Sequence, residues 1–136
     1  MPGRLVDTNV LVRFFTGQPS DMASKAKALV AQAEAGTVVL DILPVIVAET
    51  IYTLESFYGM DRQEVAHKLH LFLQSKGVRV QERARVLDAL LRHRDYSVHF
   101  ADAYLAAAAA DSGLTVSSFD RDLDKFADVK RVEPPS

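Results

Sequence analysis

Hydrophobic and polar positions follow two alternating periods along this chain of 136 residues. Short runs of Val, Ile and Leu predict buried strands, and longer stretches with apolar residues three or four positions apart predict helices. The strands are expected at 5–6 with 10–11 (a first short strand running into a turn), 37–42, 78–80, 114–117 and 129–132. The helices are expected at about 20–35, 44–58, 61–77, 82–93, 97–112 and 121–127.

Boundary residues support several of these helices. Ser20 can cap a helix, and Pro44 suits a first helical turn, where its missing N–H costs nothing. Asp61 with Glu64 forms a start resembling a capping box, in which each side chain bonds the backbone near the other. Gly113 follows the helix predicted to end at 112, in the usual place of a C-terminal glycine.

Strands that alternate with helices predict an α/β fold with a mainly parallel central sheet flanked by helices. The length fits one domain over residues 1–136. Ligands of such sheets bind beyond the carboxyl ends of the strands. Asp7 and Asp120 follow predicted strands, whereas Glu49 and Asp102 lie in helices that can lean over that edge.

The composition narrows the setting. The chain has no cysteine, which excludes disulfides and zinc–thiolate sites. No apolar run reaches the roughly 18 residues of a membrane span, and no leader pattern is visible, so we expect a cytoplasmic protein without membrane contact. The formal net charge of −2 gives no general nucleic-acid signal.

Four acidic residues interrupt apolar sequence: Asp7, Glu49, Asp102 and Asp120. A carboxylate in an apolar setting is costly unless it is paired, protonated or bound to a metal. No cationic partner is obvious nearby in the sequence, so the set indicates a hard divalent cation with oxygen ligands.

Each acid alone also has an ordinary explanation. Asp7 can cap a turn, Asp120 can cap a helix, and Asp102 can favour the dipole at a helix start. Glu49 can pair with a distant arginine. Four separate ordinary roles would have to coincide to explain all four acids. One shared site explains them with a single assumption.

The motifs around these acids resemble PIN-domain ribonucleases, and more narrowly the VapC toxins of bacterial and archaeal toxin–antitoxin pairs. The resemblance runs from Leu5 to Pro134. It rests on Asp7-Thr8-Asn9, on Leu43-Pro44 through Ala48-Glu49, on Phe100-Ala101-Asp102-Ala103, and on Ser118-Phe119-Asp120-Arg121-Asp122-Leu123.

The resemblance implies a PIN-like three-layer fold and a magnesium-dependent endoribonuclease in which Mn²⁺ can substitute. Asp7, Glu49, Asp102 and Asp120 are then the metal-binding and catalytic acids. Thr8, Asn9 and Ser118 support the acids or a bound water, and Asp122 either ligates through water, replaces Asp120 or simply caps the short helix. Hydrolysis by a metal-activated water leaves a 5′-phosphate, and the sequence does not choose between one and two ions.

The same resemblance implies an RNA substrate, a VapB-like antitoxin partner and a homodimer. The alternatives are a housekeeping PIN nuclease and a catalytically silent PIN-like module that binds RNA or protein. A DNA nuclease of the flap type is disfavoured by the short chain.

Three further features have open interpretations. Arg13 and the basic residues between Arg79 and Arg94 either contact RNA or lie on a solvated face. His67 and His70 have metal-compatible spacing, but a surface position is favoured because no third ligand is evident. The apolar stretch 45–58 supplies core residues and either a partner groove or a dimer contact.

Overall fold

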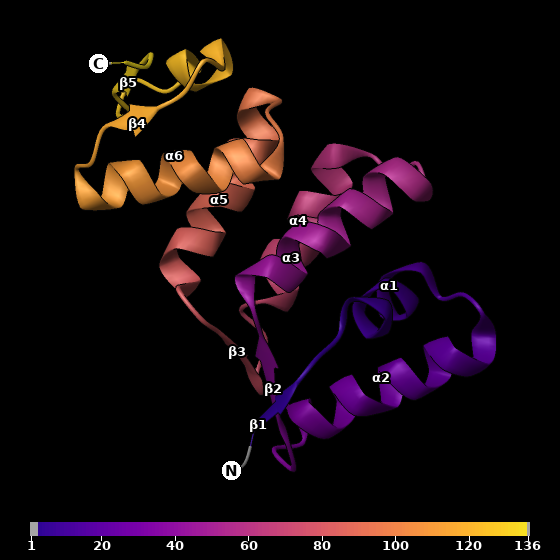
Figure 1. Ribbon diagram of the computed structural model, residues 1–136. Coiled ribbons are helices and arrows are strands. Elements are labelled where there is room, and N and C mark those ends of the chain that lie inside the picture. Colours follow the sequence, from indigo (N-terminus) through magenta and orange to yellow (C-terminus); the bar gives the residue numbers. More distant parts are fainter. Residues whose placement is uncertain (1–2, 136) are drawn as a thin grey trace. The chain divides into compact units, whose positions relative to one another are not determined.

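The computed structural model describes residues 3–135 and confirms an α/β fold with parallel strands (Figure 1). Residues up to Arg83 form one compact unit and residues from Ala84 onward form a second, called the N-terminal and C-terminal units below. Within residues 3–135, no helix is both long enough and apolar enough to cross a membrane.

The N-terminal unit is built on a three-stranded parallel sheet in the order β1-β2-β3, with β1 at Gly3–Leu5, β2 at Val39–Ile42 and β3 at Val78–Val80. Leu40 and Ile42 of the central strand are fully buried. Gly77, with φ +82°, precedes β3 so close to the Ala33 carbonyl that a Cβ would collide with it.

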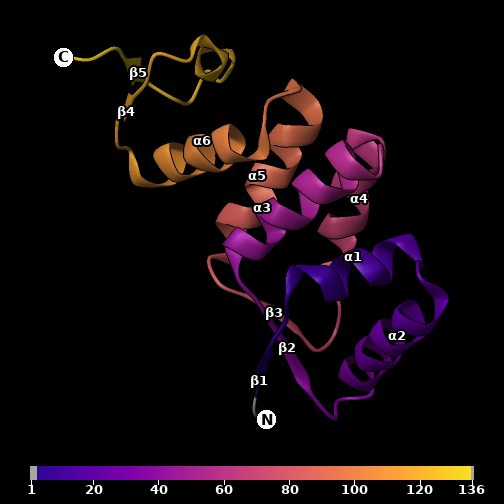
Figure 2. The ribbon, with the colours of Figure 1, turned by 45° about the vertical axis from the view of Figure 1, so that its right-hand side comes forward.

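Helices pack around this sheet: α1 (Thr8–Thr16), α2 (Ser20–Glu34), α3 (Pro44–Tyr52), the π-helical turn η1 (Thr53–Phe57) and α4 (Arg62–Phe72). Helix α1 contacts both α2 and α3, and Figures 1 and 2 both show α1 beside α2. The predicted starts of α3 and α4 are confirmed at Pro44, which occupies the first turn, and at Asp61, which accepts bonds from the Gln63 and Glu64 N–H groups. The predicted cap at Ser20 is wrong, because Pro19 occupies the N-cap of α2 and makes no side-chain bond there.

Helix α1 corrects the prediction of a strand and turn at 10–11. The carboxylate of Asp7 caps the helix, Leu11 and Val12 are buried, and Gly17 ends the helix in the left-handed region. The apolar residues Val10 and Leu11 predicted a strand, because such a short apolar run is typical of strands rather than of helices. Packing of one apolar face, together with the cap, stabilises a helix there instead.

The C-terminal unit contains α5 (Arg83–Tyr96), α6 (Phe100–Ser112), β4 (Val116–Ser117), the 3-10 turn η2 (Arg121–Lys125) and β5 (Arg131–Val132). Strands β4 and β5 form a two-stranded parallel sheet of their own. Helix α6 buries Ala103, Ala106 and Ala107 and contacts β4 and η2, because these small side chains allow close approach. Two carboxylates of this unit are Asp102, in the first turn of α6, and Asp120, at the start of η2.

Candidate active site

The position of Asp7 follows from the chain path between β1 and α1. Its Oδ1 accepts a hydrogen bond of 2.8 Å from the Thr8 N–H, so the capping role considered for this residue is real. The residue remains exposed. Because an ionised carboxylate can accept several bonds, one capping contact leaves lone pairs of Asp7 available to a ligand.

Glu49 projects from the exposed face of α3. Val47 and Ile51 of the same helix are buried, whereas Val45 and Tyr52 share the exposed side with Glu49. Among the described residues Glu49 has no ion-pair partner, so the alternative of a salt bridge to a distant arginine finds no support. The apolar neighbours of Glu49 in the sequence predicted an apolar setting, but the side chain of Glu49 is exposed.

Asp7 and Glu49 line one pocket of about 320 Å³ in the N-terminal unit. Thr8 and Asn9 line it from the first turn of α1, and Phe57 and Tyr58 line it from the end of η1. Thr8 is 6% exposed, and its Oγ1 is buried without a hydrogen-bond partner among the described residues. An unpaired buried hydroxyl is costly, so a polar ligand at this pocket would stabilise it.

The C-terminal unit brings a second pair of acids together. Asp102 lies in the first turn of α6 and Asp120 caps η2, with its Oδ1 accepting 2.9 Å from the Asp122 N–H. Partial burial raises the pKa of Asp102, and the charge of Asp120 raises it further, while His99 opposes the shift. Like charges that cannot move apart penalise full ionisation, which a bound cation would relieve.

The loop that carries Asp120 is held from both sides. The Ser118 hydroxyl accepts 2.9 Å from the Asp120 N–H. Arg131 donates 2.9 Å to the Ser118 carbonyl and grips Asp124 with two bonds of 2.9 and 3.0 Å. Arg131 was missed by sequence reasoning, because its partners lie seven and thirteen positions away and no local pattern connects them.

One of the roles considered for Asp122, that of capping the short helix, is wrong. Asp120, rather than Asp122, caps η2. The carboxylate of Asp122 lies 3.6 Å from the Lys125 ammonium, and its charge contributes to the raised pKa of Asp102. Asp122 therefore faces the acid pair without capping the turn.

Most of the basic residues considered for RNA contact are engaged by carboxylates. Arg79 pairs with Asp41 across β2 and β3, and Arg94 pairs with Asp95. Arg92 donates to both Asp88 and Asp128, and Arg85 pairs with Asp111. These pairs support the interpretation of a solvated, ion-paired face.

Arg13 is different because it lines the pocket that contains Asp7 and Glu49. Its Nη1 donates 3.1 Å to the Tyr58 hydroxyl, which holds the guanidinium in place. Its Nε is buried and lacks a partner among the described residues.

The histidines do not build a metal site in the described structure. His67 is exposed, and His70 contacts Gln74. His93 is buried and its Nδ1–H donates 2.6 Å to the Val98 carbonyl, which is a structural role. Within residues 3–135, no group of three or more His, Asp or Glu side chains is gathered closely enough to hold a metal ion.

The donor chemistry of the two pairs nevertheless suits a hard divalent cation. All four acids offer carboxylate oxygens, three of them are exposed, and Asp102 carries a raised pKa that positive charge would lower again. The unpaired Thr8 hydroxyl adds an oxygen beside the first pair.

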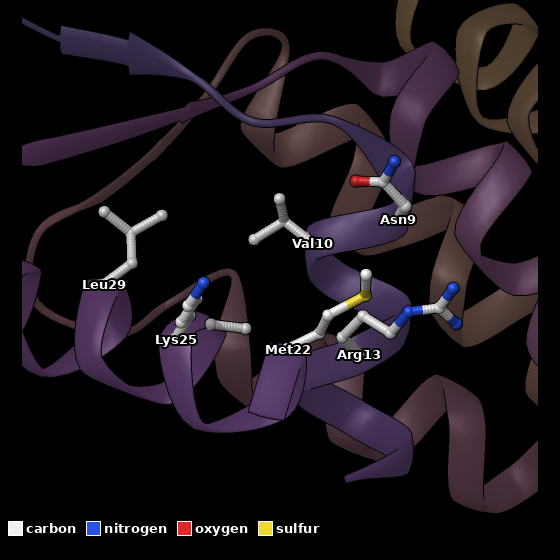
Figure 3. Close-up of a pocket in the computed structure, with 7 residues that line it drawn as sticks. Asn9, Val10, Arg13, Met22, Lys25 and Leu29 are labelled. Carbon is white, nitrogen blue, oxygen red and sulfur yellow. The ribbon is translucent and has the colours of Figure 1, made fainter. Parts of the chain in front are cut away.

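A second pocket, of about 440 Å³, lies between α1 and α2 and shares Asn9 and Arg13 with the first. Figure 3 shows Met22, Lys25 and Leu29 of α2 facing Val10 of α1. Apart from Asn9, Arg13 and Lys25 its lining is apolar. The two pockets differ in chemistry, since one is mainly apolar and the other contains two carboxylates.

Comparison with known proteins gives one family match. The model of the PIN domain family matches residues 4–129 and so runs through both compact units and all four acids. No curated protein matches the chain.

Proposed function

The chain belongs to the PIN-domain family, and from that premise we propose that it is a divalent-metal-dependent endoribonuclease. PIN domains are generally nucleases that act on nucleic acids. One observation carries the proposal: each compact unit presents a pair of carboxylates, Asp7 with Glu49 and Asp102 with Asp120. We assign both pairs to one reaction and the whole chain to a single PIN domain, because the family match spans both units.

Mg²⁺, or Mn²⁺ in its place, would be held by Asp7, Glu49, Asp102 and Asp120. When bound, such an ion lowers the pKa of a coordinated water and neutralises charge on the phosphoryl oxygens. Asp7 keeps its orientation through its bond to the Thr8 N–H, and Asp120 keeps its own through the bonds that Ser118 and Asp122 make with it. The protein therefore supplies preoriented carboxylates, and no nucleophilic side chain is required.

The biological role we propose is that of a VapC-like toxin in the cytoplasm, paired with a VapB-like antitoxin. The mainly apolar pocket between α1 and α2 supports this partner, because it suits an apolar segment of an antitoxin tail. The homodimer rests on the family resemblance, and sedimentation of the purified protein tests it.

The central experiment measures RNA cleavage by purified protein with Mg²⁺, with Mn²⁺ and with EDTA. Cleavage is expected only with metal. Asp7→Asn, Glu49→Gln and Asp102→Asn should each remove most activity with the fold intact by circular dichroism. Full cleavage in EDTA, or by any of these variants, contradicts the metal-dependent mechanism.

Growth assays test the toxin role separately. Expression of the wild type should slow growth, expression of Asp7→Asn should not, and a cognate antitoxin should restore growth. A wild type that cleaves RNA in vitro but is harmless in several hosts indicates a housekeeping nuclease. An intact protein without cleavage under any metal indicates a binding module.

A further inference from the structure

Among the described residues, Phe57 is the most exposed aromatic side chain, at 80%, and it lies at the pocket that contains Asp7 and Glu49. A single exposed apolar side chain is common on a protein surface, so the exposure of Phe57 is informative only together with its neighbours in this pocket. The position is not a consequence of a loose end, because Leu54 of the same turn is buried at 1% exposure.

The π-helical turn explains how Phe57 comes to point outward. The Tyr58 N–H donates 3.2 Å to the Thr53 carbonyl, five residues back. Such a turn advances fewer degrees per residue than an α-helix, so Phe57 is rotated further from buried Leu54 than an α-helical turn would place it. Turns of this kind are frequent at functional sites.

Two further groups complete the surroundings of the Phe57 ring. Tyr58 packs against it edge to face, with ring centroids 5.2 Å apart and planes at 66°. The Tyr58 hydroxyl accepts the bond from Arg13, whose Nε remains unpaired among the described residues. One pocket therefore combines an exposed ring, a fixed guanidinium and a pair of carboxylates.

We propose that Phe57, braced by Tyr58 and accompanied by Arg13, is a stacking subsite for one unpaired nucleobase of the RNA, next to the phosphate that meets Asp7 and Glu49. The proposal rests on the proposed nuclease function. An aromatic face suits any base, and arginine suits the phosphate backbone. Bases inside a duplex are already stacked, so the subsite selects unpaired RNA.

The chemistry of the pocket favours a nucleotide over an apolar protein segment. An apolar segment placed here would strip water from Asp7 and Glu49 without replacing their hydrogen bonds, which is costly. A nucleotide brings a flat ring for Phe57 and an anion for Arg13. The neighbouring pocket, lined by Val10, Met22 and Leu29, is the better match for an apolar segment.

The test measures binding of single-stranded RNA oligonucleotides in Mg²⁺, with Asp102→Asn as the background because that change prevents cleavage and lies in the other compact unit. Phe57→Ala should weaken binding about 5- to 150-fold, the range of one lost base stack. Phe57→Leu should weaken RNA binding by a similar factor, because leucine keeps apolar area but has no π-face. Phe57→Tyr should bind RNA nearly as tightly as the parent protein. Scanning one abasic position through the oligonucleotide should locate a site whose loss affects the parent but not Phe57→Ala.

Tyr52→Ala is the matched control, because Tyr52 is 71% exposed on α3 but does not line the pocket. It should leave RNA binding unchanged. Phe57→Leu binding as tightly as the parent, or Tyr52→Ala losing as much as Phe57→Ala, overturns the stacking subsite. A change of oligomeric state in Phe57→Ala without loss of RNA affinity overturns it in favour of a contact between copies of the chain.

The outcomes separate this proposal from the nuclease assignment. If the wild type cleaves RNA with Mg²⁺ while Phe57→Ala keeps full affinity and kcat/KM, the subsite is wrong and the nuclease stands. If the wild type cleaves no RNA but binding still depends on the Phe57 ring, the subsite stands and the nuclease is wrong.

Discussion

The two compact units each present a pair of acids, but they hold them in different ways. In the N-terminal unit, Asp7 and Glu49 are carried by helices whose apolar faces are packed, with Leu11 and Ile51 at 1–2% exposure. In the C-terminal unit, Asp120 lies on a loop held by charged contacts, above all those of Arg131. Apolar packing has no titratable group and therefore depends little on pH, whereas ion pairs respond to pH and are screened by salt.

The second difference is electrostatic. Asp102 is partly buried and is opposed by Asp120, so its pKa is raised. The first pair instead shares its pocket with the cation of Arg13 and the rings of Phe57 and Tyr58. The N-terminal pair thus has cationic and aromatic neighbours, whereas the two C-terminal carboxylates repel each other.

The largest expected effect tests whether both pairs serve one reaction. Glu49→Gln and Asp102→Asn should each lower kcat/KM for RNA by more than about 100-fold, because losing even an outer partner of a metal ligand costs about 10- to 100-fold. The double variant should lose little more than either single variant, since groups that act as a unit are not additive. The measurement is the cleavage rate in Mg²⁺ of the wild type, the two single variants and the double variant. If the loss in the double variant equals the product of the two single losses, the pairs do not act as one unit.

Removing the support of the Asp120 loop should have the next largest effect. Arg131→Leu should lower activity by about 10- to 100-fold and raise the Mg²⁺ concentration needed for half-maximal rate. Arg131→Lys should recover only part of this, because lysine lacks the planar fork that grips Asp124 and the Ser118 carbonyl together. The Mg²⁺ titration distinguishes this positioning role from general loss of stability.

Arg79→Leu is the matched control for Arg131→Leu. Arg79 also makes two bonds to one aspartate, Asp41, but its side chain is 61% exposed on a strand pair, against 11% for Arg131. Exposed pairs contribute little, so Mg²⁺ dependence should stay at the wild-type value. An equal shift in both variants removes the special role of Arg131.

The third prediction concerns the stability of the metal-free protein. The pKa of an aspartate in an unfolded chain is about 3.9. Because the folded pKa of Asp102 is higher, the folded state binds more protons between the two values. The contribution of Asp102 to the free energy of unfolding therefore falls as pH rises from about 4 through the folded pKa. Asp102→Asn should raise the metal-free melting temperature slightly at pH 7.

Mg²⁺ completes that measurement. Binding to the folded state should stabilise the wild type by about 2.7 kcal/mol at a hundredfold excess over the dissociation constant, and Asp102→Asn should respond less. Thermal melts at pH 7 with and without Mg²⁺ are sufficient. A wild type that ignores millimolar Mg²⁺, together with a destabilised metal-free variant, indicates a structural partner for Asp102.

The smallest expected effect lies in the acid range. The hydrogen bonds from Arg92 lower the pKa of Asp128, so the stability that this pair contributes is present above the unfolded pKa and is lost as pH falls through the folded one. Acid-unfolding curves below about pH 4 should therefore be less steep for Asp128→Asn than for the wild type.

Asp41→Asn provides the corresponding change in the N-terminal unit. Its effect should be smaller still, because the Arg92 side chain is 12% exposed and lies over the Phe126 ring, whereas Arg79 is largely in solvent. Equal acid sensitivity of the two variants contradicts the contrast between the units.

Local sequence determined much of the fold. Pro44, Asp61 and Gly113 mark helix ends because each acts on backbone groups within a few residues, and all three act where predicted. The strand at 78–80 and the α/β class follow from apolar runs in the same way. The four motifs with their acids were visible without any structure, and the family match covers them.

Other features depend on contacts between residues that are distant in the sequence. Helix α1 is stabilised by the burial of Leu11 and Val12 in the core. A short apolar run in the sequence does not show whether it will be buried as a helix or as a strand. Whether Glu49 is buried depends on which face of α3 meets that core. The pairing of Arg131 with the Asp120 loop, and of Phe57 with the pocket of the first acids, joins residues through space. Backbone bonding is local and can be predicted from nearby residues, whereas side-chain partners and exposure are fixed only when the packed elements meet.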